Sequence, residues 1–146
     1  MDEPLLEEAL TAWRIFLNAH AAAVRRIEED LAAEQALPLV EYDVLVALEH
    51  APHARLRLRD LNRKVVLTRS GITRLVDRLE EAGLLKRERH GEDRRAIYAA
   101  LTDEGRAAIR RTWPIYARGI QRYFARYLDT QEISVLTEAL EHVAEQ

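Results

Sequence analysis

The stretch over residues 68–102 constrains the fold of this chain most. It opens with apolar side chains at i, i+3, i+4 and i+7, a spacing that predicts one buried helical face; these are Ile72, Leu75, Val76 and Leu79. Gly83 follows, as is typical of a helix C-terminus. Residues 84–90 and 96–102 then read as two short strands around the charged sequence GEDRR, which carries a turn signal. The stretch therefore predicts a helix, a tight turn and a hairpin with a basic tip.

The segments before this stretch read as helices and one very short strand. Apolar residues recur at alternating steps of four and three over residues 6–31, which predicts a helix of about thirty residues whose broad apolar stripe needs a partner to cover it. Residues 40–48 are apolar almost all round, so we expect a second, buried helix. Alternation over residues 55–58 suggests a short strand, and residues 61–65 a short helix.

Two more helices are predicted after Thr102, which reads as a helix N-cap. A helical stripe runs over residues 109–128, and Pro114 inside it should kink this helix rather than end it, because the pattern keeps its phase. Asp129 and Glu132 have the spacing of a capping box that begins the last helix. We therefore expect a mainly α fold with a small β-wing, a winged helix-turn-helix held between N- and C-terminal helices.

The charge of the chain is unevenly distributed. The formal net charge of −3 averages three unlike parts: residues 1–54 carry 3 basic and 11 acidic side chains, residues 55–100 carry 13 and 7, and residues 101–146 carry 6 and 7. All but two of the basic residues are arginine, which suits planar recognition of phosphate and guanine, although a coding bias would give the same excess. The positive charge thus coincides with the predicted wing and its helix.

Several classes of protein are disfavoured. The chain has no cysteine, which argues against disulfides, thiol catalysis and cysteine zinc sites. The acidic start does not resemble a signal peptide and no apolar run reaches ~18 residues, so we expect a cytoplasmic protein with no membrane partner. His50 and His53 flank a predicted helix end at Pro52 without a ligand cluster, so we expect no metal and no cofactor. Nothing resembles a phosphate loop or a catalytic triad, so an enzyme is not expected.

The polar face of the helix over residues 68–82 is the first candidate binding surface. Its acids, Asp77 and Glu81, lie toward the C-terminal half, so only the N-terminal half, at the positive end of the helix dipole, can approach phosphates without repulsion. This polarity is typical of a recognition helix in a major groove. The predicted DNA contacts on it are Thr68, Arg69, Ser70, Thr73, Arg74 and Arg78. The alternative is an ordinary solvated face.

The hairpin tip is the second candidate surface. Arg94 and Arg95 could enter a minor groove, where a narrow A·T-rich site concentrates negative potential, and Asp93 is placed to orient one guanidinium group. A charged hairpin tip is by itself usually a soluble loop. Its position about a dozen residues after a basic helix favours duplex DNA, with a helical dimer that binds protein or RNA as the alternative.

The same residues resemble a known family. LTRSGITRLVDRLEEAGLLKR, EDRRA and LTDEGR resemble the multiple-antibiotic-resistance regulator (MarR) family of bacterial transcription factors. The resemblance implies a homodimeric DNA-binding transcriptional regulator on a pseudo-palindromic operator, often a repressor released by a small aromatic or phenolic ligand. It divides the single domain 1–146 into dimerisation helices at 1–36 and 103–146 and a DNA-binding lobe at 55–102. By position, Arg95 matches the family's minor-groove arginine and Asp93 its orienting acid.

The sequence departs from the pattern of that family at two positions, Gly71 and Arg59. Gly71 should weaken the recognition helix by about 1 kcal/mol relative to alanine, and Arg59 stands where a capping Ser or Thr is more usual. The resemblance implies an effector pocket between the dimer helices and the lobe. Aromatic and titratable side chains on the helical stripes could line it: Trp13, Phe16, His20, Tyr42 and Trp113. Packing in the core or at a dimer contact is the alternative for each.

Overall fold

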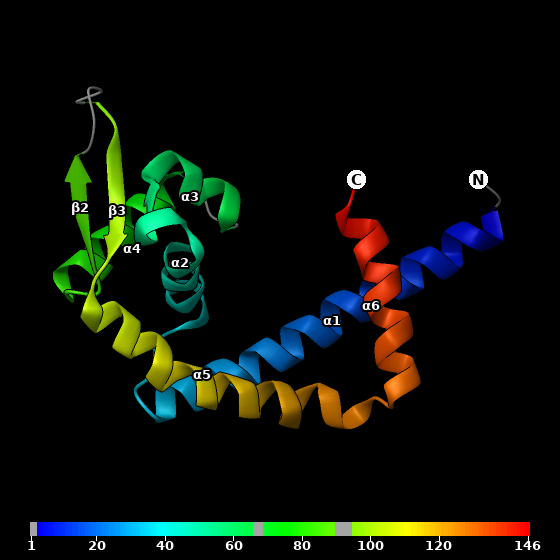
Figure 1. Cartoon of the computed structure of the whole chain (residues 1–146). Helices are drawn as coiled ribbons and strands as arrows, with labels where there is room; N and C mark the ends of the chain where they lie inside the picture. The colour runs from blue at the N-terminus through cyan, green and yellow to red at the C-terminus, as the bar shows by residue number, and fades with distance from the viewer. Residues whose placement is uncertain (1–2, 66–68, 90–94) are drawn as a thin grey trace. The chain divides into compact units, whose positions relative to one another are not determined.

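The computed structural model describes residues 3–65, 69–89 and 95–146 and confirms the predicted fold class, mainly α-helical with one small antiparallel sheet (Figure 1). The chain forms two compact units, one of residues 31–114 and one of the remaining N- and C-terminal residues. In chain order the elements are α1 (Glu3–Ala33), α2 (Leu39–His50), η1 (Pro52–Ala54), β1 (Arg55–Arg57), α3 (Leu58–Lys64), α4 (Arg69–Glu81), β2 (Leu85–Arg89), β3 (Ile97–Leu101), α5 (Asp103–Tyr123), η2 (Ala125–Tyr127) and α6 (Thr130–Ala144).

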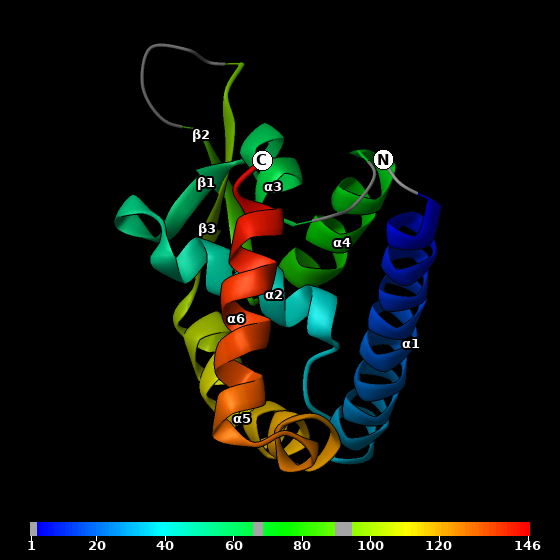
Figure 2. The ribbon, with the colours of Figure 1, turned by 90° about the vertical axis from the view of Figure 1, so that its right-hand side faces the viewer.

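The unit of residues 31–114 is built on a three-stranded sheet in the order β1-β3-β2 (Figures 1 and 2). The β2–β3 hairpin pairs Leu85 with Leu101 at its base and Arg89 with Ile97 toward its tip. The apolar faces of α2, α3 and α4 supply the core of the unit, in which Val44, Leu61 and Val76 are fully buried. The prediction of a buried second helix is therefore confirmed, and the helix-turn-helix pair α3 and α4 rests on it.

The turn after α4 shows why that helix ends where it does. Gly83 has a φ of 78°, in the left-handed region that costs glycine least. The amide of Gly83 donates to the carbonyl of Glu80, and the amide of Leu84 donates to the carbonyl of Leu79, both at 2.9 Å. These two bonds form a Schellman motif, which satisfies carbonyls at the helix end and turns the chain into β2.

Thr102 joins the base of the hairpin to α5. Its hydroxyl donates to the carbonyl of Gly83 at 2.6 Å and accepts from the amide of Gly105 at 3.0 Å. The predicted N-cap is thus confirmed, and the same hydroxyl also holds the turn after α4. We refer to Gly83, Thr102 and Gly105 together as the Thr102 latch. Because Gly83 precedes β2 and Thr102 follows β3, the latch ties the two strands together at the base of the hairpin.

In the other unit, α1 lies alongside the second half of α5 (Figures 1 and 2). Ile27 is buried there against Gly119, and the hydroxyl of Tyr123 donates to Asp30 at 2.8 Å. As expected, α5 continues through Pro114. The prediction that this helix reaches Leu128 was wrong, because α5 ends at Tyr123 and one turn of 3₁₀ helix follows.

The predicted capping box at the start of α6 is confirmed. The Asp129 carboxylate accepts from the amide of Glu132 at 2.7 Å, and the Glu132 carboxylate accepts from the amide of Asp129 at 3.3 Å. Asp129 has the extended backbone that an N-cap requires, with ψ at 173°. The end of α5 lies earlier, just before Phe124, whose backbone has a φ of −135° and so leaves the helical region.

Candidate nucleic-acid interface

Helix α4 presents a polar face opposite its buried stripe. Ile72, Leu75, Val76 and Leu79 are buried, as predicted. Thr73 and Arg74 are exposed on the other side, and so is Arg78, whose guanidinium lies 3.6 Å from the Glu41 carboxylate of α2. Arg69 and Ser70 lie in the first turn of the helix, and Thr68 falls outside the described residues. The described part of the helix therefore keeps the polarity that its sequence predicted.

The hairpin of β2 and β3 stands beside α4. Arg95 precedes β3 and is exposed, whereas Asp93 and Arg94 lie outside the described residues. Strands β2 and β3 pair without interruption from Leu85–Leu101 to Arg89–Ile97, so the described part of the hairpin is regular. A helix with a basic first half and a two-stranded wing therefore belong to one unit, which is the arrangement that the sequence predicted.

The acidic half of α4 is tied to the wing. The amide of Arg87 on β2 donates to one Glu80 carboxylate oxygen at 2.7 Å, and its guanidinium donates to the other at 2.7 Å. The same guanidinium donates to Asp77 at 2.5 Å. We name these three residues the Arg87 clamp. The sequence indicated only that Asp77 and Glu81 would repel phosphate, and it gave Glu80 no role. The spacing of three from Asp77 to Glu80 was the available signal for a shared partner.

The clamp changes the proton affinity of its members. The backbone amide of Arg87, followed by its guanidinium, lowers the pKa of Glu80. Burial acts to lower the pKa of Arg87, but the hydrogen bonds from its side chain to Asp77 and Glu80 outweigh it, so the pKa of Arg87 is raised. Both shifts favour the charged forms, so the clamp remains an ion pair near neutral pH.

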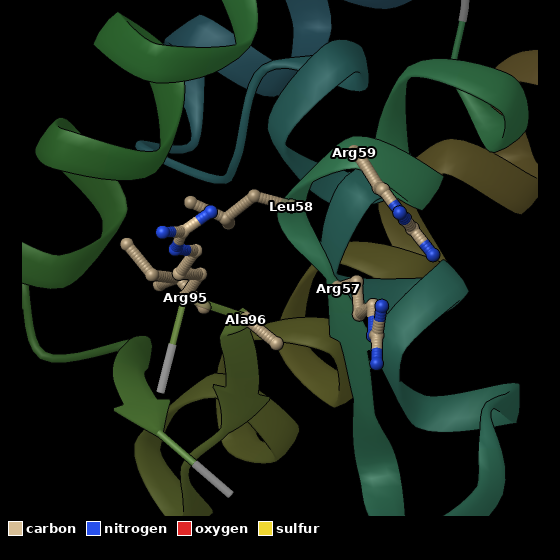
Figure 3. Close-up of a pocket in the computed structure, with 6 residues that line it drawn as sticks. Arg57, Leu58, Arg59, Arg95 and Ala96 are labelled. Carbon is tan, nitrogen blue, oxygen red and sulfur yellow. The ribbon is translucent and has the colours of Figure 1, made fainter. Parts of the chain in front are cut away.

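A basic hollow lies at the corner between β1 and α3. Its volume is about 310 Å³, and among the described residues it is lined by Arg57, Leu58, Arg59, Arg95, Ala96 and Ile97. Figure 3 shows Arg57 and Arg59 on one side of it and Arg95 with Leu58 on the other. Sequence reasoning missed this site. The alternation of arginine and leucine over residues 55–58, interpreted only as a strand, and the further arginine at position 59 were the available signal.

Tyr98 on β3 organises the arginines of this corner. Arg57 donates from Nε to the Tyr98 hydroxyl at 3.1 Å. The guanidinium carbons of Arg57 and Arg55 lie 5.6 and 5.8 Å from the centre of the Tyr98 ring. Arg55 also lies 4.0 Å from Glu88 of β2. Cation–π contacts of this kind attract both guanidinium groups to the ring and so restrain the two side chains.

The predicted effector residues are divided between the two units. Trp13, Phe16 and His20 are exposed on α1, where the two aromatic rings lie 6.1 Å apart. Tyr42 is buried on α2 and Trp113 is half exposed on α5. A pocket that these residues share stays a prediction. A hollow of about 440 Å³ between α1 and the end of α5 is lined instead by other residues, among them Arg26 and Tyr123.

Two further properties bear on the candidate sites. In the described part of the chain, no three His, Cys, Asp or Glu side chains gather as metal ligands would. None of the described helices is both long and apolar enough to cross a bilayer.

Known proteins resemble the chain in sequence and in fold. The model of the MarR family matches residues 37–96. The HTH-type transcriptional regulator YkoM of Bacillus subtilis, itself uncharacterised, is 30% identical over 85% of this chain and 79% of its own length. The structure of Sco3205, a MarR family regulator of Streptomyces coelicolor solved in complex with DNA, is 32% identical with a TM-score of 0.84, over 94% of this chain and 90% of that one. AbsC of the same organism, also a MarR family regulator, is 29% identical with a TM-score of 0.83, over 93% and 91%.

Proposed function

Because the chain belongs to the MarR family of DNA-binding transcriptional regulators, we propose that it acts as a homodimeric repressor on a pseudo-palindromic operator. The observation that carries this proposal is the pairing of a helix whose exposed face is basic in its first half with an adjacent wing that bears Arg95. In a duplex, α4 would enter the major groove and the wing the neighbouring minor groove. The alternative of a dimer that binds protein or RNA is not favoured by these relatives.

Individual side chains receive distinct roles in this proposal. Arg69, Ser70 and Thr73 begin α4 and would reach base edges. Arg74 would contact a base or a phosphate, and Arg78, already held near Glu41, would contact a phosphate. At the wing, Arg95 would enter the minor groove, with Asp93 and Arg94 beside it. Thr68 would complete the contacts at the start of the helix.

The homodimer is supported by apolar side chains that the chain leaves exposed. On α1 they are Leu6, Leu10, Trp13, Phe16 and Leu17, and on α6 they are Ile133, Val135, Leu140 and Val143. Apolar faces of this extent mark association surfaces in soluble proteins. A second copy of the chain is the partner that a palindromic operator requires.

The test begins with selection of preferred sequences from random duplexes, followed by titration of the selected operator. We expect charge reversal by Arg74→Glu or Arg95→Glu to abolish binding at physiological salt, since each replaces an attraction to phosphate with repulsion. Arg110→Glu, an exposed position on α5 with the same change of charge, is the matched control and should bind within a few-fold of the parent chain. Duplex binding without sequence preference would contradict the proposal.

Release by a small aromatic ligand is the finer part of the proposal. It is supported by the adjacent, exposed rings of Trp13 and Phe16 and by the titratable His20 one turn further along α1. The same titration, repeated with phenols and aromatic acids, tests it: an effector should raise the dissociation constant for the operator. A panel that leaves this constant unchanged would count against ligand release and would leave the DNA-binding proposal intact.

A further inference from the structure

The basic hollow at the β1–α3 corner has a composition that fits an anion. Half of its described lining residues are arginine and the rest are apolar, so no described carboxylate lines it. Arg59 is exposed on α3, while Arg57 is half buried where β1 ends. Pockets for neutral small ligands are lined predominantly by apolar and aromatic groups with few polar ones. Three guanidinium groups around one hollow instead indicate a ligand with concentrated negative charge.

Arg57 is held in place before any ligand arrives. Its Nε donates to the Tyr98 hydroxyl, and its guanidinium lies over the Tyr98 ring. A guanidinium can contact a phosphate end-on, through its two terminal nitrogens, and the bond from Nε to Tyr98 does not compete with that mode. Fixing the side chain in advance reduces the conformational entropy that binding would otherwise cost.

The position of the hollow identifies the source of the phosphate. Arg95, which the proposed function assigns to the minor groove, forms one wall of the hollow, and Arg57 and Arg59 form the other (Figure 3). A minor groove is only about 6 Å wide, so a side chain that enters it lies within one side-chain length of the phosphates on its edge. DNA that receives Arg95 must therefore bring its backbone to the mouth of the hollow.

We propose that Arg57 and Arg59 hold one backbone phosphate of the operator in this hollow, with Tyr98 as the positioning residue for Arg57. The inference rests on the proposed function and extends it from the grooves to the strand at their edge. The contact carries no base information. Its role is to fix the register of the wing, so that Arg95 meets the same step of the minor groove in every complex.

The first test replaces single operator phosphates with neutral methylphosphonates, one position at a time. In the parent complex, we expect one position in each half-site, next to the minor-groove contact, to lose about tenfold in affinity through this hollow. In Arg57→Gln/Arg59→Gln, the same replacement should cost little, because both guanidinium groups of the contact are gone, and in Arg59→Gln alone the penalty should be reduced. Tyr98→Phe should reduce the penalty at that position and leave all other positions unchanged.

The second test measures how operator affinity depends on salt. The Arg57→Gln/Arg59→Gln variant should lose one unit of the slope of log K against log salt, about the contribution of one phosphate, with its sequence preference unchanged. Arg59→Lys should keep the slope, and Arg110→Gln/Arg111→Gln, which removes two exposed arginines of α5, is the matched control for lost charge. Because Arg59 is exposed, Arg59→Gln alone remains interpretable if the double variant folds poorly.

The outcomes separate this inference from the function on which it rests. A double variant with the slope and the methylphosphonate profile of the parent protein overturns the phosphate site while operator binding stands. A variant that changes sequence preference overturns it too, because the contact would then read bases. If the unchanged protein binds no operator, the proposed function fails first and the phosphate site fails with it.

Discussion

At the scale of single residues, the Thr102 latch shows what sequence can and cannot predict. The cap at Thr102 and the helix end at Gly83 follow from local rules, because both depend on neighbours in the chain. The role of Gly105 does not. A Cβ atom at this position would lie 2.1 Å from the carbonyl oxygen of Leu84 and 2.6 Å from a methyl group of Leu101. Only the folded lobe brings that carbonyl next to α5.

Gly105→Ala should therefore destabilise the lobe even though alanine favours helices. We expect a loss of about 1–3 kcal/mol in the free energy of unfolding, because the backbone of Leu84 must move to admit the methyl group. Urea denaturation measures it, with Arg110→Ala on the exposed side of α5 as the control, within about 0.5 kcal/mol of the parent. An unchanged midpoint for Gly105→Ala would show that α5 does not pack this closely.

At the scale of elements, the Arg87 clamp joins the recognition helix to the wing. Asp77 and Glu80 belong to α4 and Arg87 to β2, so three side-chain and backbone bonds cross between the two elements that would contact DNA. The Arg87 side chain is 27% exposed, which limits the screening of these bonds by water. The clamp thus fixes the separation of α4 and β2 within the lobe.

Glu80→Gln should weaken the clamp in a way that depends on pH. Since the pKa of Glu80 is lowered in the folded chain, its contribution to stability is complete above the unfolded value of about 4.3 and is lost as the pH falls through the folded value. We expect a loss of about 1 kcal/mol at pH 7, already reduced for the 38% exposure of this side chain. The difference from the parent should shrink below about pH 4.3.

Urea denaturation at pH 7, 5 and 3.5 measures this difference. Glu81→Gln, an exposed carboxylate on the same helix, is the control and should stay within about 0.5 kcal/mol of the parent at pH 7. If Glu80→Gln lost the same amount at every pH, the carboxylate charge would not be the cause.

The elements themselves were largely predictable, for a definite physical reason. A helix with one buried stripe carries its period in the sequence, so the core face of α4 was identified from spacing, whereas α2 was identified as buried because it is apolar almost all round. The end of α5 could not be identified from spacing, because Phe124 and Leu128 continue the apolar spacing of the helix beyond the residue where it ends. The basic hollow was missed for a related reason: it combines β1 with residues forty positions away on the wing, and only the sheet pairing joins them.

At the scale of the whole molecule, the remaining apolar surface points to association. On α1, the side chains from Leu6 to Leu17 that carry the stripe are between 41% and 55% exposed. On α6, Leu140 and Val143 remain exposed although they continue the stripe that begins at Ile133. Helices with an exposed apolar stripe are unusual in an unpartnered chain, because helix propensity alone rarely stabilises a helix in water.

Leu140→Arg should separate the proposed dimer. A charge placed in a buried apolar contact cannot be compensated, so we expect the dissociation constant of the dimer to rise about a hundredfold. Glu138→Gln lies on the opposite face of α6 and changes the net charge by the same amount, so it is the matched control. Sedimentation equilibrium measures both. A Leu140→Arg chain that stays dimeric at every concentration would contradict an interface on α6.

The Thr102 latch has a consequence for how this lobe can be re-engineered. It closes the wing at its root, through bonds that involve no residue between Arg89 and Arg95. The root therefore does not depend on what the tip contains. Replacing residues 90–94 with the matching segment of another regulator should therefore alter operator choice while the thermal midpoint of the lobe, measured by calorimetry, stays that of the parent.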